Sequence, residues 1–583
     1  MLRSTAEMVV QLRDSFGDVP PALMGASTTI LGTRLFLFGG RTRRSLGAPV
    51  VSVDLYALDI ELCRWEKLAH SSSSRGAFPV KARCFHTADI WNNHLVVFGG
   101  LSALNSESNP GAGTERLQPL NDVALLDLDK FEWLPPTSSP SSTSAPVPKP
   151  PPIPPARHNH ISCVSSSTDE LFIFGGTDAW GAPLADLCVY DLTKRSWVRA
   201  QRYACALDGE RAFLAGMKWQ VCFDGNGGGD DGDVSEPPPL PYSQLASSGD
   251  IYLFESRTPS IDILTPLPSS GGIKAVPLCI GGRAIDWPTG LHRPSGGVLG
   301  TTLVVAGTAV STGRTGVWAL DLIANAWNRV DIDTNGLGKN SGMWGAAHVY
   351  SSRNKLLLVG AGSKPATNDA DMDSLSASAS QTYTTHAIID LEALGIYQPP
   401  ARSFDPSHQQ RALTILASGR HADFAFVCED GRAIPCARVL VAGRWPWLHD
   451  QLELLRPITS ALSPTSATPD SLRATGKQTR ITATALLQYF YSLALGTRLQ
   501  RAPPVLSQLL VIATEFRIEY LQALVQHAMH LALDREVGLC GNGDGGIARG
   551  VYEVAASCGC RSLQIRTRKV AFRRRSTRSV YDP

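Results

Sequence analysis

LFIFGG, at residues 171–176, is the most informative stretch of this sequence, because closely similar stretches stand twice before it. LFLFGG occupies residues 35–40 and LVVFGG occupies residues 95–100. Each reads as a short buried strand that ends on two glycines, which permit a backbone turn that a Cβ atom would obstruct. A chain that contains the same strand and turn three times is built from repeated units.

A second pattern follows each glycine pair. An alternating strand leads to an aspartate, and a tryptophan stands six residues after it: Asp59 with Trp65, Asp127 with Trp133, and Asp191 with Trp197. A further strand precedes each glycine pair, as at residues 84–90. Four short strands per unit, repeating every few tens of residues, are typical of a β-propeller.

The glycine pair after an apolar strand and the tryptophan behind an aspartate turn resemble kelch repeats. Weaker copies at residues 301–307 and 355–362 keep Asp321 with Trp327 and Asp390 with Tyr397, and residues 211–225 and 250–267 predict a degenerate blade before them. We therefore expect an all-β kelch propeller of six blades at residues 21–400, with the tryptophans wedged between neighbouring sheets. A stray strand at residues 276–282 would make seven.

One face of such a propeller collects the long loops. If the strands of a blade are named A to D outward from the central channel, the glycine pair ends strand B, so B–C loops and links from D to the next A emerge together. Residues 101–120, 224–249 and 363–383 are expected there, with the link at 135–155, in which ten of 21 residues are proline. Loops on a rigid scaffold often carry function, so this face is expected to bind a target protein. The proline-rich link is either a spacer or a ligand for an SH3 or WW module.

Basic side chains recur where strand A begins on this face. The candidate partner-binding residues are Arg83, His86, Arg157, His158, Arg211 and Arg293. A ring of arginines would suit an acidic or phosphorylated segment, because guanidinium forks match carboxylates and phosphates. The alternative, equally open, is that these arginines cap backbone carbonyls between blades.

Composition narrows the functional classes. A length of 583 residues predicts more than one domain, and a net charge of +2 argues against a nucleic-acid-binding protein. No apolar run approaches the ~20 residues of a membrane span, and the first twenty residues lack a signal-peptide core. We therefore expect a cytoplasmic protein whose 12 cysteines are free thiols.

The candidate motifs for binding a metal or cofactor and for catalysis do not match the required residue patterns. DADMD at residues 369–373 begins like a calcium-binding loop, but Ser374 and Ser380 occupy the positions that need glycine and glutamate. Cys558 with Cys560, or His527 with His530, lacks zinc-type spacing. No nucleophile motif is present, so we expect no metal, no cofactor and no enzymatic activity.

After residue 400 the pattern changes to mixed strands and helices. A hairpin at residues 423–436 and a following helix resemble the start of a BTB/POZ domain, and the matching residues are Asp423, Gly431, Ile434, Pro435, Arg444 and Pro446. Ala437, Trp445 and Leu448 depart from the family, which usually has His, Ser and Phe there. The resemblance implies an α+β BTB domain at residues 415–535, with a disordered insertion at 456–480 and a dimer contact through Asp423, Trp445 and Trp447.

The end of the chain repeats the closing helix pattern of that domain. A short helical extension is expected at residues 547–570, followed by a basic tail at 571–583. The tail is open to several interpretations: a nuclear-import signal, a contact with acidic lipid, a phosphorylation site at Ser576, or a plain solvated tail.

Together these features resemble kelch–BTB proteins, such as the leucine-zipper-like regulators and many fungal members. The resemblance implies a non-enzymatic adaptor, in which the propeller binds a target and the BTB domain dimerises and recruits a cullin-type ubiquitin ligase. The alternative is a bivalent scaffold in cell polarity or cytoskeletal organisation, in which dimerisation raises avidity.

Overall fold

The computed structural model describes residues 8–42, 50–70, 80–104, 117–135, 153–165, 168–202, 213–214, 219–222, 242–245, 251–255, 260–266, 273–278, 287–332, 337, 344–361, 381–401, 403–459, 471–473, 479–538 and 546–578. The chain divides into two compact units. Unit 1 comprises residues 1–218 and 246–391, and unit 2 comprises residues 219–245 and 392–583.

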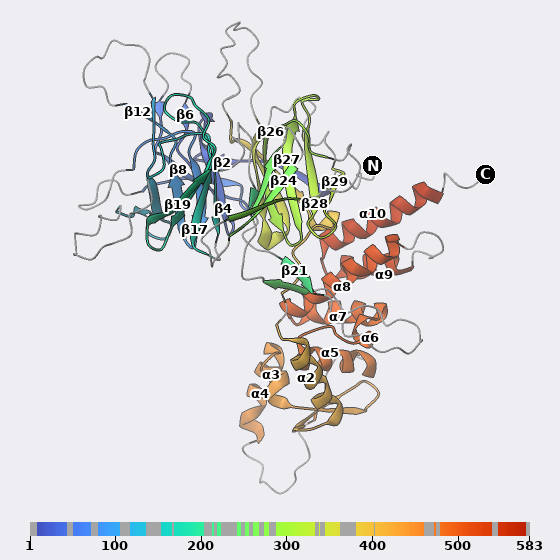
Figure 1. Cartoon of the computed structure of the whole chain (residues 1–583). Coiled ribbons are helices and arrows are strands. Elements are labelled where there is room, and N and C mark those ends of the chain that lie inside the picture. The colour runs from blue at the N-terminus through green and yellow to red at the C-terminus, as the bar shows by residue number, and fades with distance from the viewer. Residues whose placement is uncertain are drawn as a thin grey trace. The chain divides into compact units, whose positions relative to one another are not determined.

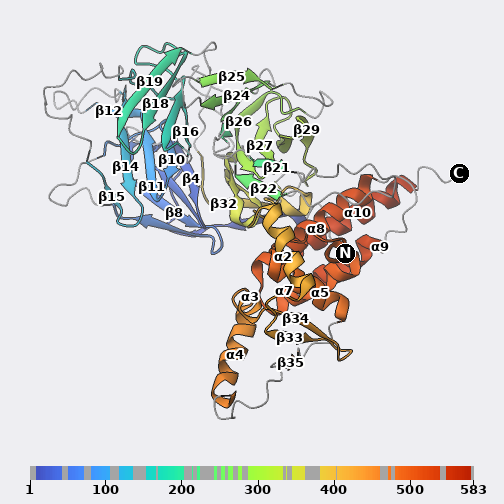
Figure 2. The same cartoon turned by 60° about the horizontal axis from the view of Figure 1, so that its bottom comes forward.

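Unit 1 is an all-β propeller. Its described residues include six sheets that each contain four antiparallel strands in sequential order (Figures 1 and 2). Blade 1 contains β4 (Ser27–Leu31), β5 (Arg34–Phe38), β8 (Leu55–Asp59) and β9 (Arg64–Leu68). Blade 2 contains β10 (Thr87–Trp91), β11 (His94–Phe98), β14 (Val123–Asp127) and β15 (Glu132–Trp133). Blade 3 contains β16 (Ile161–Ser165), β17 (Glu170–Phe174), β18 (Asp186–Asp191) and β19 (Ser196–Arg202).

The second half of the ring follows the same order. Blade 4 contains β20 (Phe213–Leu214), β23 (Ile251–Glu255), β24 (Ser260–Pro266) and β25 (Ile273–Pro277). Blade 5 contains β26 (Leu291–Leu299), β27 (Thr302–Ala309), β28 (Thr315–Asp321) and β29 (Ala326–Arg329). Blade 6 contains β30 (Trp344–Tyr350), β31 (Lys355–Ala361), β32 (Thr385–Asp390) and β1 (Val10–Asp14).

The repeated aspartate forms the turn between strands C and D. Asp59 Oδ1 accepts hydrogen bonds from the backbone N–H groups of Glu61 and Leu62, at 3.0 and 2.8 Å, and Cys63 then adopts a φ of 59°. Asp127, Asp191 and Asp321 accept from their own turns in the same way. A short acceptor side chain at the start of a tight turn replaces a missing backbone partner, so the aspartate sets the turn that precedes each tryptophan.

The tryptophans lie between blades, as the sequence predicts. Three of them contact an aromatic ring on strand B of the preceding blade, with ring centroids 5.3, 5.6 and 5.9 Å apart: Trp133 with Phe38, Trp197 with Phe98, and Trp327 with Phe254. Trp65 of blade 1 likewise faces the preceding blade of the ring, which is blade 6. There its Nε1 donates to the carbonyl oxygen of Tyr383 at 3.1 Å. The equivalent environments confirm the repeat.

The ring closes through its first strand. β1 pairs antiparallel with β32, with Val10 opposite Ile389 and Asp14 opposite Thr385, and so supplies the outermost strand of blade 6. Val9, just before this strand, is fully buried. The predicted propeller boundary at residue 21 is therefore wrong, because the closing strand precedes it.

Small sheets extend several loops. The 2-residue strands β3 (Leu23–Met24), β6 (Arg41–Thr42) and β7 (Val50–Val51) pair beside blade 1, and β2 (Phe16–Gly17) pairs in parallel with β9. β12 (Leu101–Ala103) and β13 (Leu117–Pro119) form a hairpin in the B–C loop of blade 2. β21 (Trp219–Cys222) and β22 (Tyr242–Leu245), which belong to unit 2, pair with each other and stand in the chain between β20 and β23. Of residues 224–249, which were predicted in a B–C loop, all but 242–245 lie outside the described residues, and these four precede strand B in the chain.

The C-terminal part of unit 2, from residue 392, begins with a short polar cluster. η3 (Glu392–Leu394) and Tyr397 contact helices α8 (Glu519–Gly538) and α10 (Arg561–Arg578). Arg566 Nη1 lies 2.7 Å from His530 Nδ1, and His530 Nε2 lies 3.2 Å from Glu392 Oε1, so the fully buried imidazole is bonded on both nitrogens. These bonds fix Glu392 to the last helix of the unit.

The remaining elements of unit 2 are mixed. A three-stranded sheet, with β33 between antiparallel β34 and parallel β35, precedes a stack of helices (Figure 1). The elements, in chain order, are α2 (Pro406–Ser418), β33 (Phe424–Val427), β34 (Ala433–Cys436), α3 (Arg438–Ala442), α4 (Pro446–Thr459), β35 (Ser471–Arg473), α5 (Arg480–Ser492), α6 (Arg498–Arg501), α7 (Pro503–Glu515), α8, α9 (Gly546–Ser557) and α10.

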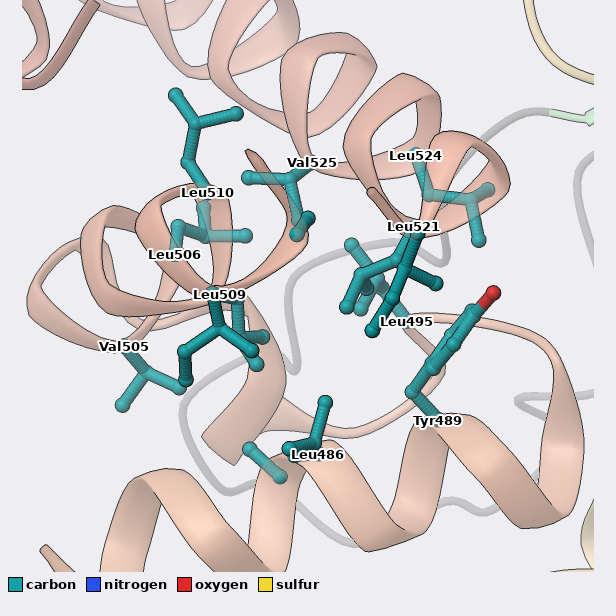
Figure 3. Close-up of a cluster of buried hydrophobic side chains, with 14 of the residues drawn as sticks. Leu486, Tyr489, Leu495, Val505, Leu506, Leu509, Leu510, Leu521, Leu524 and Val525 are labelled. Atoms are coloured by element: carbon teal, nitrogen blue, oxygen red, sulfur yellow. The ribbon is translucent and has the colours of Figure 1, made fainter. Parts of the chain in front are cut away.

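The core of unit 2 lies where α5, α7 and α8 meet. Leu486 and Tyr489 from α5 face Leu509 from α7 and Leu521 from α8 in Figure 3, and all are buried. An apolar stripe on each helix predicts this contact.

Two predicted segments of unit 2 are wrong in part. The insertion predicted at 456–480 contains the end of α4 and the strand β35, which supplies the third strand of the sheet; residues 460–470 and 474–478 lie outside the described part. α10 continues to Arg578, past the predicted start of the tail at 571. In both segments the polar composition indicated irregular structure, whereas the backbone forms a helix or a strand.

Candidate partner-binding face of the propeller

Arg83, the first predicted binding residue, lies just before strand A of blade 2. Its Nη1 and Nη2 donate to the two carboxylate oxygens of Asp122 at 3.1 and 2.7 Å. Nη1 also donates to the carbonyl oxygen of Gly99, and Nε donates to that of Lys81, both at 3.1 Å. One guanidinium therefore joins the ends of strands A, B and C of blade 2.

Arg157 repeats this arrangement in blade 3. Its Nη1 and Nη2 donate to the carboxylate of Asp186 at 2.6 and 2.8 Å, and Nη1 donates to the carbonyl oxygen of Gly175 at 3.0 Å. The backbone of both arginines bonds to the preceding blade: Gly40 N–H donates to Arg83, and Gly100 N–H donates to Arg157, both at 2.9 Å. Each arginine thus links two blades.

Histidines three residues later add a second link. His86 Nε2 lies 2.7 Å from Ser27 Oγ of blade 1, and His160 Nε2 lies 2.9 Å from Thr87 Oγ1 of blade 2. Burial, and next to it the charge of Arg83, holds the pKa of His86 well below its usual range. Burial likewise lowers the pKa of His160 to about 3. Both rings are therefore neutral at physiological pH.

The glycine pair makes room for these side chains. An added Cβ on Gly99 would lie 2.9 Å from both the carbonyl oxygen of Arg157 and Cε1 of His160. On Gly100 it would lie 2.7 Å from the Cβ of His86. Backbone of the next blade and the histidine of the same blade therefore occupy the space that side chains would fill, which explains both glycines of the motif.

In both of these ion pairs the carboxylate, and not the guanidinium, reaches solvent. Arg83 and Arg157 have 0% of their side chains exposed, whereas Asp122 is 47% and Asp186 is 22% exposed. The geometry favours the structural alternative for these arginines, because a partner could reach them only by displacing internal bonds. His86 is buried and His158 is half-buried; Arg211 and the side chain of Arg293 lie outside the described residues.

The inner strands carry further polar contacts that the sequence analysis missed. His348 Nε2 on β30 lies 2.8 Å from Thr28 Oγ1 of blade 1, and burial lowers its pKa to about 4. Asp89 on β10 accepts a hydrogen bond from Ser162 on β16, and burial raises its pKa to about 6. A histidine without a preceding arginine gives no repeat signal, so His348 could not be found from the motif.

An exposed aromatic residue on this face was also missed. Trp180, in the B–C loop of blade 3, is 89% exposed. It follows the glycine pair by four residues in TDAWGAP, residues 177–183. A tryptophan between an aspartate and a glycine in a loop of a propeller is a signal that could have been used.

The predicted dimer residues of unit 2 have internal roles. Trp445 is 1% exposed and stacks on Phe490 with ring centroids 5.2 Å apart, and Trp447 packs against Phe516 at 4.9 Å. Asp423 Oδ1 accepts the backbone N–H of Arg438 at 2.7 Å, at the start of α3. Trp445 therefore belongs to the core and does not contribute to an exposed apolar surface.

Two negative findings concern the described residues alone. They contain no group of three or more His, Cys, Asp or Glu side chains placed to hold a metal ion. Among their helices, none combines the length and the apolar character that a membrane crossing requires.

The geometry of unit 1 is that of a β-propeller built from repeated blades, and comparisons with known proteins support a kelch propeller. Residues 2–150 match the family profile described as the KLHDC2/KLHL20/DRC7 Kelch-repeats domain. Protein ral2 of Schizosaccharomyces pombe is 24% identical, over 96% of this chain and 93% of that protein.

Other relatives match only part of this chain. Host cell factor 1 of Homo sapiens is 29% identical over 31% of this chain and 8% of its own length. Kelch domain-containing protein 3 of Homo sapiens is 26% identical over 34% of this chain and 49% of its own. The solved structure of YjhT matches 63% of this chain and 95% of its own, at 13% identity and with a TM-score of 0.37.

Proposed function

We propose that this chain is a non-enzymatic protein-interaction adaptor whose propeller binds a target protein through its B–C loop face. The observation that carries the proposal is the lattice of buried Arg–Asp and His–hydroxyl bonds between blades. It holds the loops of one face on a rigid ring, which is the arrangement that recognition surfaces use. The kelch-containing relatives support an interaction or scaffold role.

For unit 2 we propose a BTB/POZ domain that dimerises and recruits a cullin-type ubiquitin ligase. Its support is the resemblance in sequence, together with a strand hairpin, two helices and a third strand in parallel with the first. Because Trp445 is buried, the dimer surface is assigned instead to exposed apolar side chains on three helices. These are Ile415 on α2 (37% exposed), Val439 on α3 (80%) and Ile481 on α5 (55%).

Light scattering on the full chain tests dimerisation. A dimer has twice the 62.6 kDa of one chain. Val439→Glu should shift the mass toward the monomer, because a charge at the centre of an apolar interface loses its hydration. Val310→Glu, at a 71% exposed residue of the propeller, is the matched control. A monomer at tens of micromolar would contradict the proposal, since a standard interface binds more tightly.

Co-purification with the tagged full chain then separates the two functional classes. A cullin recovered with the chain, and lost with Val439→Glu or with another surface variant of unit 2, supports the ligase adaptor. A dimer that captures target proteins but no cullin supports the bivalent scaffold. We place the adaptor in the cytoplasm, with nuclear entry through the basic C-terminal tail, which imaging of a chain lacking residues 571–583 would test.

A further inference from the structure

Trp180 is the most exposed of the large apolar side chains in the described part of the chain. It is 89% exposed, whereas Trp65, Trp133 and Trp327 are almost fully buried. A tryptophan buries 150–250 Å² when it packs, so leaving one in water forgoes a large stabilisation. Nothing in the fold of blade 3 uses this side chain.

The turn that carries Trp180 is held by internal hydrogen bonds. Asp178 Oδ1 accepts the backbone N–H groups of Trp180 and Ala182, at 2.9 and 2.8 Å. Asp178 N–H donates to the carbonyl oxygen of Ala182 at 3.0 Å, and Gly181 N–H donates to that of Asp178 at 3.3 Å. Five-residue turns with four internal bonds lose little entropy on binding, so the indole is presented ready for contact.

The turn itself carries one negative charge, the carboxylate of Asp178. The carboxylate of Asp186, at the start of β18, is paired with the guanidinium of Arg157, and Arg202 on β19 stands opposite it. In the described residues no hydrogen bond reaches Asp178 Oδ2, which leaves one carboxylate oxygen of the turn that carries the indole available to a partner. His158 bonds to Thr177 through its backbone, and burial lowers the pKa of its ring, so it adds no positive charge.

We propose that the Trp180 turn is an anchor for a segment of the target protein that presents an arginine or lysine side chain to the indole face and to Asp178. The proposal rests on the proposed function of the propeller and names the chemistry of its partner. A cation over an indole is attracted by the negative face of the ring, and a neighbouring carboxylate adds to this attraction. An acidic segment would instead meet like charge.

Fluorine NMR on the full chain tests the chemistry of the turn directly. The chain is labelled with 5-fluorotryptophan at its 12 tryptophans, and Trp180→Phe identifies the resonance of Trp180. The probes are N-acetyl-arginine amide, N-acetyl-norleucine amide and N-acetyl-glutamate amide. We expect the arginine probe to shift the Trp180 resonance, with a response that weakens as salt rises.

A matched variant isolates the carboxylate. Asp178→Asn keeps an oxygen that can accept the turn hydrogen bonds but removes the charge, and it should weaken the arginine response about two- to fivefold. An equal response to norleucine, a response to glutamate, or no response to arginine overturns the proposal. The other tryptophan resonances report whether the fold is intact in each variant.

Panning random peptides on the full chain separates this inference from the proposed function. Enriched peptides that carry Arg or Lys, and that lose at least about tenfold in affinity with Trp180→Ala but not with Ile323→Ala, in an exposed C–D turn, support the anchor. Enriched peptides that are acidic, or that bind Trp180→Ala equally well, overturn the anchor and leave the propeller a binding surface. An arginine response without any enriched peptide supports the anchor and counts against the proposed function.

Discussion

Arg83 and Arg157 carry their charges below the surface, whereas the carboxylates that neutralise them reach solvent. Sequence gives the residue type and its repeat position but not its exposure, which depends on whether Asp122 and Asp186 fold over the guanidinium. An arginine that donates to both a carboxylate and a strand-end carbonyl has no donor left for a partner in that direction.

Replacing Arg157 tests this structural role. Arg157→Ala should destabilise the propeller by about 3 kcal/mol, because Asp186 and the Gly175 carbonyl lose their partner. Lys67→Ala, which breaks an exposed pair with Asp54, should change stability by at most about 1 kcal/mol. Denaturant unfolding measures both. Arg157→Ala/Asp186→Ala should lose less than the single variant, because no carboxylate remains unpaired.

The opposite result has a definite meaning. If Arg157→Ala melts at the wild-type temperature and target binding falls, the basic ring predicted from the sequence is the partner site. Unchanged binding per folded molecule, together with lower stability, assigns the arginine to the fold.

Buried neutral histidines should make the propeller sensitive to acid. The unfolded imidazole titrates near ~6.5, whereas the folded pKa of His160 is about 3. The unfolded state therefore binds more protons between these values, and stability falls as pH drops below ~6.5. At pH ~5 this amounts to about 2 kcal/mol for His160, and the direction is the same for His86.

Asp89 acts in the opposite sense and offsets part of this loss. Its folded pKa is about 6, above the unfolded value, so the folded state gains protons as pH falls from about 6. Melting temperatures of the wild type and His160→Gln, measured from pH ~7 to pH ~5, check the prediction. The variant should start less stable and show a shallower decline. Parallel curves would contradict it.

At the scale of the element, the glycine pair is required for two reasons: its positive φ, and the lack of room for a Cβ atom. Gly100 has a φ of 92°, and an added Cβ would lie 2.7 Å from the Cβ of His86 and 2.8 Å from the carbonyl oxygen of Cys84. Gly32 has a φ of 58° in a turn with nothing within 4 Å. A substitution at Gly32 therefore causes backbone strain alone, whereas one at Gly100 causes backbone strain and a steric clash.

Gly100→Ala should therefore be much more destabilising than Gly32→Ala. Gly32→Ala, the control, should lose only the energy of placing a side chain in a left-handed conformation, about 1–2 kcal/mol. The Gly100 variant should lose roughly 1–3 kcal/mol more, because the end of strand B must move away from the start of strand A in the same blade. Thermal melts of the two variants give the difference, and equal losses would show that this close approach of the two strand ends has no energetic weight.

At the scale of the whole molecule, unit 1 is a closed ring of blades. β1 joins residues near the start of the chain to β32, more than 370 residues later, and completes blade 6. A ring held at one point by a single added strand should lose cooperativity when that strand is absent.

Deletion of residues 1–14 removes the closing strand and tests this point. The melting temperature of the propeller should fall by more than about 5 °C, because blade 6 loses its outer strand and the buried Val9. Deletion of residues 1–7 is the control, since it leaves β1 intact. Limited proteolysis should cut the first variant faster near blade 6. Equal stability of both variants would mean that β1 does not hold the ring.

The sequence alone determined the repeat, because strand alternation, a turn-forming aspartate and a wedging tryptophan are local or periodic signals. The first strand escaped prediction, since β1 carries no repeat motif and its partner lies at the far end of the propeller. β35 escaped for the same reason: a three-residue strand acquires its role only from pairing with β33.

The candidate site divides in the same way. The positions of Arg83, Arg157, His86 and His160 were visible in the sequence as a repeated pattern before strand A. Which of their atoms face solvent was decided by the tertiary structure, because Asp122 and Asp186 approach from strand C and the glycines admit the neighbouring blade. Trp180 and Trp445 are identical in type, yet one lies in water and the other in the core. Residue type sets what a side chain can bind, and only the packing of the chain around it sets whether a partner can reach it.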